Sequence, residues 1–554
     1  MIRPAPPAPA IDRRRYTKLR RFVLGVLLQA FLHDLLLNRR GLRSLRRDPL
    51  PRWVAVTRRF RALALELGGV LIKVGQFLSA RVDVLPPEVT SELAGLQDKV
   101  PPGPFEGIVG RVEESFGRPL SEVFARFDEE PLGAASLAQV HAATRADSEA
   151  GAGTGSRSGE TVVVKVLRPG IEVLVETDLS AVAFAVRWLK WSKRIRRRVD
   201  LDRLEQEIAK TTRAELDMRA EGANAERFGE MFADSPAITV PRVIWETTTG
   251  DVLTLEKIEA PKIDDLDAMA AAGIDRTRVA ATLFHCYLDQ VLVHQFVHAD
   301  PHPGNVFVRP APDAPDGFEL VFVDFGMIAT VPERLRASLS EYVIALATRD
   351  ARRMVRSYQR TGVLLPGADL ERLEALHEDV FERLWGIEIG AMRDVAFDQA
   401  GYFFRRYRSL IYEMPFQVQV ELLFSARAMG ILAGVTTRLD PRFDFWSEAI
   451  PVAERLARRE LWQALQEAAK GLPDSLRAAA LLPRRIERFL DEEDERRQSA
   501  RQAEPSAIGR NLPWAILSAA SLLAGAIARL GDDPAAAWFF GLAGGAFLVS
   551  RLRR

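Results

Sequence analysis

The sequence predicts an α+β protein of two lobes, with helices added before the first lobe and after the second. Short apolar strand patterns occur between residues 127 and 258, whereas three-four spacing typical of helices dominates between residues 259 and 490. Two apolar segments follow near the C-terminus. At 554 residues, with 47% hydrophobic and 27% charged residues, the chain has ample material for more than one core.

The N-terminal segment, residues 1–48, is basic on both sides of an apolar run from Phe22 to Leu37. This pattern suits a helix that lies in a membrane interface with its cations at anionic headgroups. The alternative is a helix packed on the protein's own surface. The cations are Arg13, Arg14, Arg15, Lys18, Arg20, Arg21, Arg39 and Arg40.

Net charge and cysteine content exclude some classes of protein. The formal net charge of the whole chain is +1, which argues against a nucleic-acid binder that acts through bulk charge. The single cysteine, Cys286, excludes an intrachain disulfide and a multi-cysteine metal site. It falls in a helical run from Val279 to Phe296, so we expect a buried thiol.

A helix is also expected between Leu71 and Arg81, where apolar residues recur at helical spacing before the prolines at positions 86 and 87. Lys73 and Gln76 are three residues apart and share one face of this helix. Lys and Gln on a helix ordinarily form a solvated face. These two residues therefore gain a functional meaning only from a resemblance to a known family.

From residue 127 to 166 the pattern changes to short strands. Pro131 to Ala142 has the order strand, tight loop and strand, which is typical of a unit that covers nucleotide phosphates. Alanine lacks the freedom of glycine at positive φ, so this loop should be stiff. The glycine-rich stretch 151–159 has no helix after it, and we expect a hairpin tip there. We assign four residues to nucleotide contact: Ala134, Ala135, Ser136 and Val140.

The strand from Thr161 to Leu167 alternates, which buries one face and directs Lys165 into a cleft where it contacts phosphates. Such a lysine needs an acidic partner on a nearby helix. We expect one long amphipathic helical segment, from residue 202 to 228, to supply it. Its candidate carboxylates are Glu215, Asp217 and Glu221, of which the last two share a face. One helix then offers carboxylates to two neighbours.

Catalytic and metal-binding residues are expected between His298 and Gly326. Asp300 and Asn305 have the spacing of the protein-kinase catalytic loop, H-R-D-x-x-x-x-N, and Asp324 begins a D-F-G sequence. In such sites one carboxylate orients or deprotonates the acceptor, while an amide oxygen and a second carboxylate hold Mg²⁺ on the phosphates. The strands 306–308 and 320–323 flank a Pro/Asp/Gly-rich loop, so a hairpin should place Asp324 beside Asn305.

Together these motifs predict a bilobal protein-kinase-like fold that binds ATP and Mg²⁺. The strand from Val252 to Glu256 would lead into the hinge between the lobes and offer backbone groups to the adenine, with Glu256 as a contact residue. We divide the chain into a basic segment at 1–48, a helical N-terminal extension at 49–126, an N-lobe at 127–258, a helical C-lobe at 259–490, a linker at 491–511 and an apolar hairpin at 512–550.

The apolar hairpin consists of residues 512–528 and 535–550 around a short turn. At about 1.5 Å per residue each segment spans about 25 Å, the lower limit for a bilayer core. We therefore expect a transmembrane helical hairpin with Gly and Ala between its helices. Arg510 and Arg551 then lie on one side, which the positive-inside tendency makes cytoplasmic. A soluble helical hairpin or a dimerisation element is the alternative.

The assembled residues resemble the AarF/UbiB family of atypical kinases, which is associated with ubiquinone biosynthesis. Lys73-Val74-Gly75-Gln76 matches K-x-G-Q, Gly133 to Ser136 matches an alanine-rich loop, and Glu215-Leu216-Asp217 matches E-x-D. The resemblance implies that Lys165 pairs with Glu221. It also implies a Mg-nucleotide site made by Asp300, Asn305 and Asp324. The residues that it assigns to an extension folded across the active site are Lys73, Gln76, Glu215 and Asp217.

An extension that fills the substrate cleft keeps a bulky protein substrate from bringing its hydroxyl in line with the γ-phosphate, so protein-kinase activity would be suppressed. The leading hypothesis is a membrane-anchored, Mg-dependent ATPase or kinase-like protein that supports quinone-lipid biosynthesis. The expected location is the bacterial inner membrane, with the kinase-like domain facing the cytoplasm. The implied partners are anionic membrane lipids, quinone precursors and other quinone-biosynthesis enzymes, and no nucleic acid.

Two other functions stay open. A small-molecule phosphotransferase of the aminoglycoside- or choline-kinase type also uses a histidine–acid catalytic loop, although the alanine loop and the Lys73 motif speak against it. A nucleotide-binding membrane scaffold would share the fold and have no turnover of its own.

Overall fold

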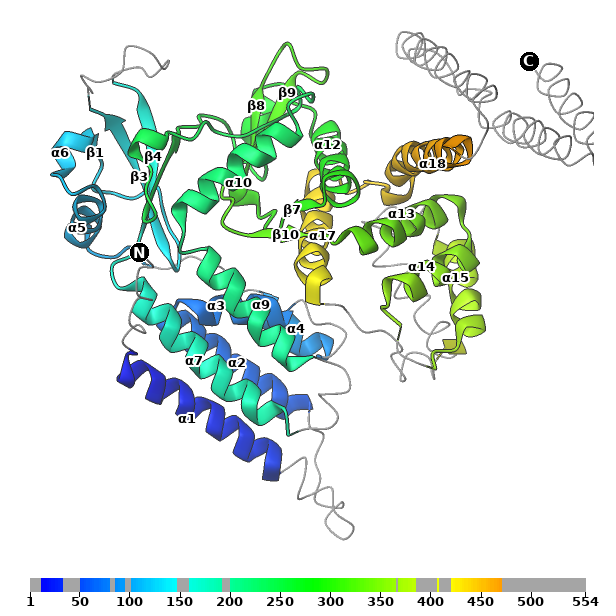
Figure 1. Cartoon of the computed structure of the whole chain (residues 1–554), viewed down its shortest axis with the longest axis horizontal. Helices are drawn as coiled ribbons and strands as arrows, with labels where there is room; N and C mark the ends of the chain where they lie inside the picture. Colours follow the sequence, from blue (N-terminus) through cyan, green and yellow to red (C-terminus); the bar gives the residue numbers. More distant parts are fainter. Residues whose placement is uncertain are drawn as a thin grey trace, which may run out of the picture. The chain divides into compact units, whose positions relative to one another are not determined.

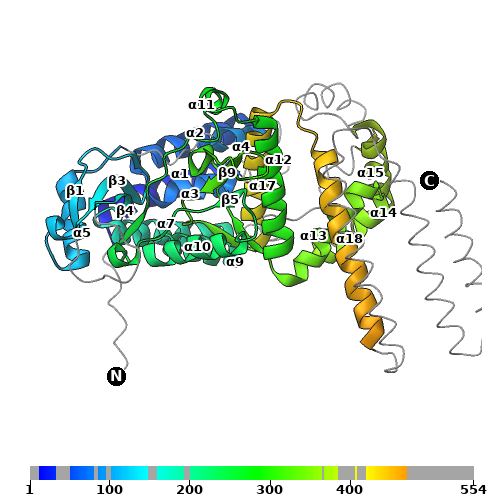
Figure 2. The ribbon, with the colours of Figure 1, turned by 90° about the horizontal axis from the view of Figure 1, so that it is seen from above.

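The computed structural model describes residues 11–32, 50–79, 85–94, 101–146, 159–191, 200–364, 367–384, 406–407 and 420–470. By its internal contacts the chain forms two units, residues 1–458 and 459–554. The first unit holds the two lobes, and its helices and strands are labelled in Figures 1 and 2.

Helices outnumber strands in the described chain. The helices are α1 (Arg13–Ala30), α2 (Leu50–Leu67), α3 (Val70–Ser79), α4 (Pro87–Ala94), α5 (Phe105–Phe116), α6 (Leu120–Val123), α7 (Ile171–Leu189), α9 (Leu201–Ala214), α10 (Met218–Met231), α11 (Leu266–Ala271), α12 (Arg276–Asp289), α13 (Glu333–Thr348), α14 (Ala351–Thr361), α15 (Leu370–Leu384), α17 (Val420–Leu439) and α18 (Phe445–Lys470). The strands are β1 (Phe124–Phe127), β2 (Gly133–Ala134), β3 (Ala138–Arg145), β4 (Thr161–Leu167), β5 (Ile238–Thr239), β6 (Val252–Glu256), β7 (Phe296–His298), β8 (Val306–Pro310), β9 (Phe318–Phe322) and β10 (Ile328–Thr330).

The first lobe is built on an antiparallel sheet with the strand order β1–β3–β4–β6, and the short β2 pairs with β3. Successive side chains of β4 point to opposite faces of the sheet, one buried and one less buried. Val162, Val164 and Val166 are buried in a core that includes α5, whereas Lys165 lies on the opposite and less buried face. Val140 of β3 is the register partner of Lys165, so both lie on that face. The alternation predicted for this strand is confirmed.

An aromatic core holds the β8–β9 hairpin of the second lobe. β8 and β9 form an antiparallel hairpin, and β7 pairs with β10. The ring of Phe228, on α10, lies 5.1 Å from that of Phe322 and 5.2 Å from that of Phe325. The N–H of Val323 donates to the carbonyl of Asn305 at 2.9 Å, so the hairpin brings the D-F-G sequence beside Asn305 as predicted. Cys286, on α12, is a buried free thiol, which is also as predicted.

Helix α1 packs along α7 (Figure 1). A buried ion pair joins the two helices. The guanidinium of Arg15 donates to both carboxylate oxygens of Asp178, at 2.6 and 2.7 Å, and to the carbonyls of Leu67 and Gly68 at 2.8 and 3.1 Å. Burial raises the pKa of Asp178, against the opposing effect of Arg15. The helix from Arg13 to Ala30 is therefore packed on the protein's own surface, one of the two alternatives that the sequence left open.

The segment that carries the candidate carboxylates is two helices, so the expectation of one helix from 202 to 228 is wrong. α9 ends at Ala214 and α10 begins at Met218. The side chain of Asp217 accepts from the N–H groups of Arg219 and Ala220, and this N-cap lets a new helix start in a new direction. Glu215 and Glu221 therefore belong to different helices and reach different neighbours.

Several predicted segments lie outside the described residues: most of the glycine-rich tip, the linker at 491–511 and the apolar hairpin at 512–550. Among the helices that the structure describes, none is both long enough and apolar enough to cross a bilayer. The transmembrane hairpin and the six-part division of the chain stay predictions.

Candidate active site

Three charged side chains meet where β4, α10 and the D-F-G sequence converge. The ammonium of Lys165 donates to Oε1 of Glu221 at 2.7 Å and to Oδ1 of Asp324 at 2.9 Å. Glu221 comes from the first turn of α10 and its side chain is only 4% exposed, whereas that of Asp324 is 46% exposed. The predicted pair of Lys165 and Glu221 is present, and the same lysine also reaches Asp324.

Burial and charge together set the protonation of this triad. Burial raises the pKa of Glu221 to about 7, against the attraction of Lys165. Although desolvation opposes the charge of Asp324, Lys165 holds the pKa of that carboxyl well below its usual range. Burial also opposes the charge of Lys165, but Asp324 and Glu221 raise the pKa of the ammonium well above its ordinary value. At neutral pH the site therefore offers a cation for phosphates and an anion for a metal.

His298 holds the backbone of the D-F-G sequence. Its Nε2 lies 2.9 Å from the carbonyl oxygen of Asp324, so this nitrogen carries the proton and donates. Its Nδ1 then accepts from the hydroxyl of Tyr287, 3.4 Å away, and its backbone N–H donates to Gln290 at 2.8 Å. Asp324 has a φ of 64°, which is rare for a residue with a side chain. The bond from His298 helps to hold this strained conformation.

The catalytic loop fixes two further polar groups. The side-chain Nδ2 of Asn305 donates to the carbonyl of Asp300 at 3.1 Å. Because the amide nitrogen is used within the loop, the amide oxygen is the atom that can bind a cation. The carboxylate of Asp300 accepts from Arg427 of α17, with 3.0 Å between Oδ1 and the guanidinium nitrogen.

A magnesium ion fits this donor set together with a nucleotide. Asp324 and Asn305 supply the oxygen ligands that Mg²⁺ prefers. In the part of the chain that the structure describes, no three His, Cys, Asp or Glu side chains are grouped so that they could hold a metal ion. Phosphate oxygens and water would have to complete the coordination, as in the sites of protein kinases.

The alanine loop is fixed by an arginine. The N–H of Ala135 donates to the carbonyl of Ala138 at 2.9 Å and closes a tight turn. Arg168, at the end of β4, donates to the carbonyls of Ala135 and Pro101, both at 2.9 Å. Ser136 is buried, while Ala134 and Ala135 are half-buried. Bonds on both sides of the turn support the predicted stiffness of the loop.

Glu256 ends β6, the strand expected to lead into the hinge. Its N–H donates to the carbonyl of Arg242 at 2.9 Å, and its carboxylate accepts from the N–H of Arg242 at 3.3 Å. The N–H of Glu256 is thus engaged within the protein. The role predicted for Glu256 in nucleotide binding stays a prediction.

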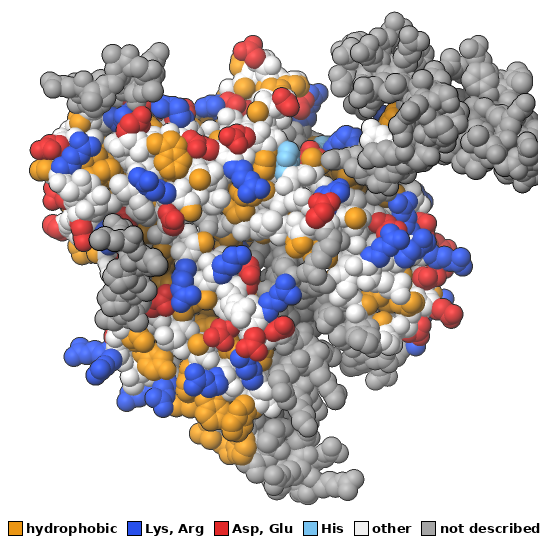
Figure 3. All heavy atoms as spheres, in the orientation of Figure 1, with side chains coloured by type: hydrophobic (Ala, Val, Ile, Leu, Met, Phe, Trp, Pro, Cys, Tyr) orange, Lys and Arg blue, Asp and Glu red, His pale blue; other side chains and the backbone are white. Residues whose placement is uncertain are grey.

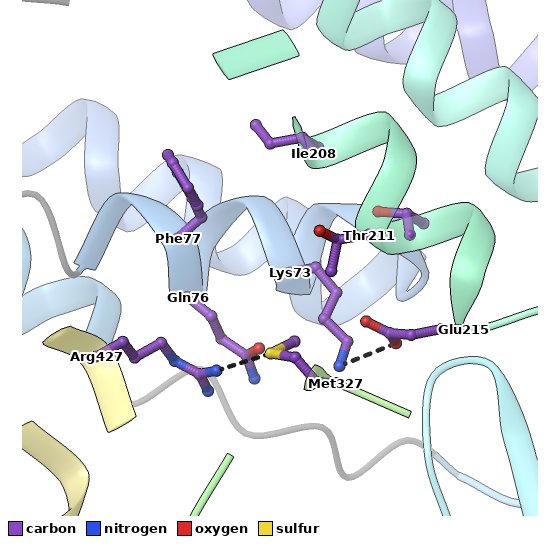
Figure 4. A pocket seen from close by; sticks show the side chains of 9 residues that line it. Lys73, Gln76, Phe77, Ile208, Thr211, Glu215, Met327 and Arg427 are labelled. Carbon is purple, nitrogen blue, oxygen red and sulfur yellow. Dashed lines mark hydrogen bonds and ion pairs between the residues drawn. The ribbon is translucent and has the colours of Figure 1, made fainter. Parts of the chain in front are cut away.

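Helix α3 of the N-terminal extension lies beside Glu215, Met327 and Arg427 (Figure 4). The Nζ of Lys73 is 3.2 Å from Oε2 of Glu215, which follows the last turn of α9. Lys73, Gln76 and Arg427 line a small pocket of about 20 Å³ together with Met327, the residue after the D-F-G sequence. The structure therefore brings Lys73, Gln76 and Glu215 together near Asp300. Asp217 instead caps the helix that carries Glu221.

Arg427 is a candidate functional residue that the sequence analysis missed. It lies 127 residues after Asp300, and its second N–H group donates to the sulfur of Met327 at 3.3 Å. The sequence did contain one indication that Arg427 has a functional partner, namely the composition of its helix. Between Glu421 and Arg438, Arg427 is the single charged residue in an otherwise apolar or neutral run, and a charge in such a run generally has a partner.

We expect Asp217→Ala to lower the free energy of unfolding by about 1 kcal/mol, because α10 loses its N-cap. Nucleotide affinity should fall as well, since α10 positions Glu221. Asp350→Ala is the matched control, because Asp350 caps α14 through the N–H of Arg353 at 2.8 Å. Thermal unfolding and nucleotide titration of both variants would check this. Equal nucleotide affinities in the two variants would contradict a positioning role for Asp217.

Comparison with known proteins decides the family. The model of the ABC1 atypical kinase-like domain matches residues 95–358. The probable protein kinase UbiB of Xanthomonas axonopodis pv. citri is 32% identical over 519 residues, which cover 90% of this chain and 90% of that protein. This chain belongs to the ABC1/UbiB family. The match to the ABC1 domain contains Lys165, Glu221 and Asp324, while Lys73 lies before it and Arg427 after it.

Other ABC1/UbiB relatives differ in length. The Arabidopsis thaliana protein "ACTIVITY OF BC1 COMPLEX KINASE 8, chloroplastic" is 34% identical over 439 residues, which cover 75% of this chain and 55% of the relative. This chain therefore spans about half the length of that plant protein. The solved Rv3197–erythromycin complex from Mycobacterium tuberculosis matches 70% of this chain and 92% of that chain, with 22% identity and a TM-score of 0.44. The predicted membership of the AarF/UbiB family and the mixed helix-and-sheet, kinase-like fold are confirmed.

Proposed function

We propose that this protein is an atypical kinase or ATPase that binds Mg-ATP and supports the biosynthesis of quinone lipids such as ubiquinone. The observation that carries the proposal is the position of Lys165 between a buried carboxylate, Glu221, and an exposed one, Asp324, at 2.7 and 2.9 Å. Protein kinases use this arrangement to present a lysine to the α- and β-phosphates and a carboxylate to the metal.

The groups of the chain would divide the work as follows. Lys165 neutralises charge on the phosphates, and Glu221 fixes the direction of its ammonium. Asp324 and Asn305 would hold Mg²⁺, which when bound would supply positive charge next to the phosphates. Asp300 orients the attacking hydroxyl or water. The bond from Arg427, at 3.0 Å, keeps the carboxylate of Asp300 in one position.

The position of the N-terminal extension supports the proposal that only a small phosphoryl acceptor can reach the site. The pocket between Lys73, Gln76, Met327 and Arg427 has a volume of about 20 Å³, which is room for roughly one water molecule. An extension helix that packs against Met327 and Arg427 would obstruct a segment of a protein substrate that had to bring its hydroxyl in line with the γ-phosphate. The proposal therefore includes suppressed protein-kinase activity, with water or a small molecule as the acceptor.

The proposal also places the protein at the bacterial inner membrane, with the kinase-like domain on the cytoplasmic side and residues 512–550 as its anchor. The support is the length and apolar character of that segment and the arginines that flank it. The proposed partners are anionic lipids, quinone precursors and enzymes of quinone biosynthesis. Membership of the ABC1/UbiB family supports this assignment.

Thermal unfolding of the purified full-length chain with Mg-ATP tests the nucleotide site. Mg-ATP at 100 times its Kd should stabilise the native state by about 2.7 kcal/mol. Asp324→Asn should remove most of this stabilisation, because the metal loses an anionic ligand. Asp313→Asn is the matched control. Asp313 is exposed in the loop between β8 and β9, so this variant loses the same charge and should keep the full stabilisation.

The same samples distinguish the alternative functions. Unchanged stabilisation of Asp324→Asn by Mg-ATP would rule out the assigned site. Phosphate release is then measured for the wild-type chain. Nucleotide binding without phosphate release would favour the non-catalytic scaffold, and a phosphorylated small-molecule product would favour the small-molecule phosphotransferase.

A further inference from the structure

Six large apolar side chains remain exposed where α1 and α7 end. Trp191 is 79% exposed and Leu28 is 58% exposed, although side chains of this kind are normally withdrawn from water. The set, which we call the end surface, consists of Leu24, Leu28, Phe31, Leu32, Trp188 and Trp191. In Figure 3 apolar side chains are visible at the lower end of the helices, with Lys and Arg side chains along their edge.

The parallel packing of α1 on α7 brings these residues to one place. The N–H of Asp12 donates to Thr177 at 3.0 Å, Arg15 binds Asp178, and the guanidinium of Arg20 lies 5.4 Å from the ring centre of Phe184. The two residues of these three contacts are 165, 163 and 164 positions apart in the sequence. The same offset places Leu24 level with Trp188, and Leu28 level with Trp191, which lies just after the end of α7.

Aromatic rings continue the contact along α7. The ring centres of Phe184 and Trp188 are 6.4 Å apart, and those of Trp188 and Trp191 are 5.3 Å apart. On α1, Leu24, Leu28 and Phe31 recur at helical spacing and form one outward stripe. Two neighbouring helices therefore present a continuous apolar and tryptophan-bearing surface at their C-terminal ends.

The charges on α1 and α7 near the end surface have one sign, whereas neighbouring helices contribute acidic residues. The sequence contains no acidic residue from Arg13 to Leu32 or from Ala181 to Trp191. Lys18 and Lys190 have acidic partners on α2 and α9, in Glu66 and Asp202. Arg20, Arg21 and Arg187 are the exposed arginines nearest the end surface, while Arg13 and Arg14 are exposed at the opposite end of α1. The sequence continues with five arginines and two aspartates in residues 33–49, and with five Lys or Arg and no acidic residue in residues 192–199, both outside the described residues.

We propose that the end surface docks on a bilayer that contains anionic lipid. Leucine, phenylalanine and tryptophan would enter the boundary between headgroups and acyl chains, and the arginines would bind lipid phosphates. A nucleic acid would bind the arginines but leave the leucine stripe exposed to water. A protein partner would not in general require that all the charges on these two helices be positive. The inference deepens the proposed membrane attachment and is independent of nucleotide turnover.

A site-specific fluorophore tests the proposal in the full-length chain. Because the single native cysteine, Cys286, is buried, a new exposed cysteine should take up nearly all of a thiol-reactive, polarity-sensitive label. Leu28→Cys and Trp191→Cys place the label on the end surface. Leu65→Cys is the control, since Leu65 is 48% exposed on α2, where Glu66 lies near the start of α1 through its pair with Lys18. The probes are vesicles of phosphatidylcholine, with or without phosphatidylglycerol.

Vesicles with phosphatidylglycerol should shift the emission of labels at positions 28 and 191 to shorter wavelengths and leave the label at position 65 unchanged. Adding Arg21→Gln and Arg187→Gln should raise the lipid concentration at half-shift by about tenfold or more, because each arginine near an anionic surface favours binding. High salt should have the same effect.

Three results would overturn the proposal. The first is no shift at positions 28 and 191, and the second is an equal shift at all three positions or with phosphatidylcholine alone. The third is a blue-shifted label before vesicles are added, which would mean that a second copy or another segment of this chain covers the surface. Since the measurement uses no nucleotide, its failure leaves the Asp324→Asn test of the proposed function unaffected.

Discussion

Lys165→Met should lower ATP turnover by about a thousandfold or more, which is the largest effect that we expect from a single substitution in the site. Methionine keeps the length and apolar stem of the side chain and removes the ammonium that bonds Glu221 at 2.7 Å and Asp324 at 2.9 Å. Bound phosphates would then lose the cation that Lys165 offers in the proposed site. Phosphate release under saturating Mg-ATP measures the effect, and thermal unfolding without nucleotide checks that the variant is folded.

Two further variants separate the role of this lysine from a general loss of charge. Lys210→Met removes an exposed lysine from α9 and should leave turnover unchanged. Glu221→Gln keeps the ammonium of Lys165 but removes the charge of its partner, so the ion pair becomes a weaker hydrogen bond. Lys165 would then bond mainly to Asp324 and compete with the metal for that carboxylate. We expect turnover of Glu221→Gln to fall by about tenfold to a hundredfold, which lies between the effects of the two other variants. Turnover of Lys165→Met within tenfold of the wild-type rate would refute the assignment of Lys165.

Sequence reasoning worked best for residues that lie close together along the chain. Asp300 and Asn305 are five residues apart, and one hairpin separates Asn305 from Asp324, so local turn signals were sufficient to place all three. Strand alternation likewise gave the face of Lys165. The pair of Lys165 with Glu221 joins residues that are 56 apart, and it followed from the resemblance to a family rather than from the pattern alone.

Contacts between distant segments were not predictable in this way. The bonds of Arg427 with Asp300 and of Arg15 with Asp178 span 127 and 163 residues, and the packing of helices decides which side chains meet. The break between α9 and α10 was missed for another reason. Hydrophobic periodicity resumes after Asp217 and conceals a change of direction that needs only three residues. Sequence patterns specify elements well, whereas the angles between helices depend on the whole core.

Arg15→Ala should lower the free energy of unfolding by about 3–5 kcal/mol, because it leaves the fully buried carboxylate of Asp178 without its cation. The carbonyls of Leu67 and Gly68 would lose their donors as well. Lys18→Ala is the control on the same helix. Its pair with Glu66, at 2.5 Å, is exposed, so we expect a loss of about 0–1 kcal/mol. Chemical denaturation of both variants measures the difference.

The pH dependence of the Arg15→Ala variant tests whether the buried charge is the cause. Burial already raises the pKa of Asp178, and without Arg15 the carboxyl should bind a proton rather than stay ionised in the core. The native state of the variant then binds more protons than its unfolded state, so its stability should fall as pH rises above the unfolded pKa of Asp178. The deficit relative to wild type should therefore be larger at about pH 8 than at about pH 5. Two results would instead identify lost packing of α1 on α7 as the cause. The first is a stability deficit that does not change with pH. The second is a double variant, Arg15→Met with Asp178→Leu, that is as unstable as Arg15→Ala.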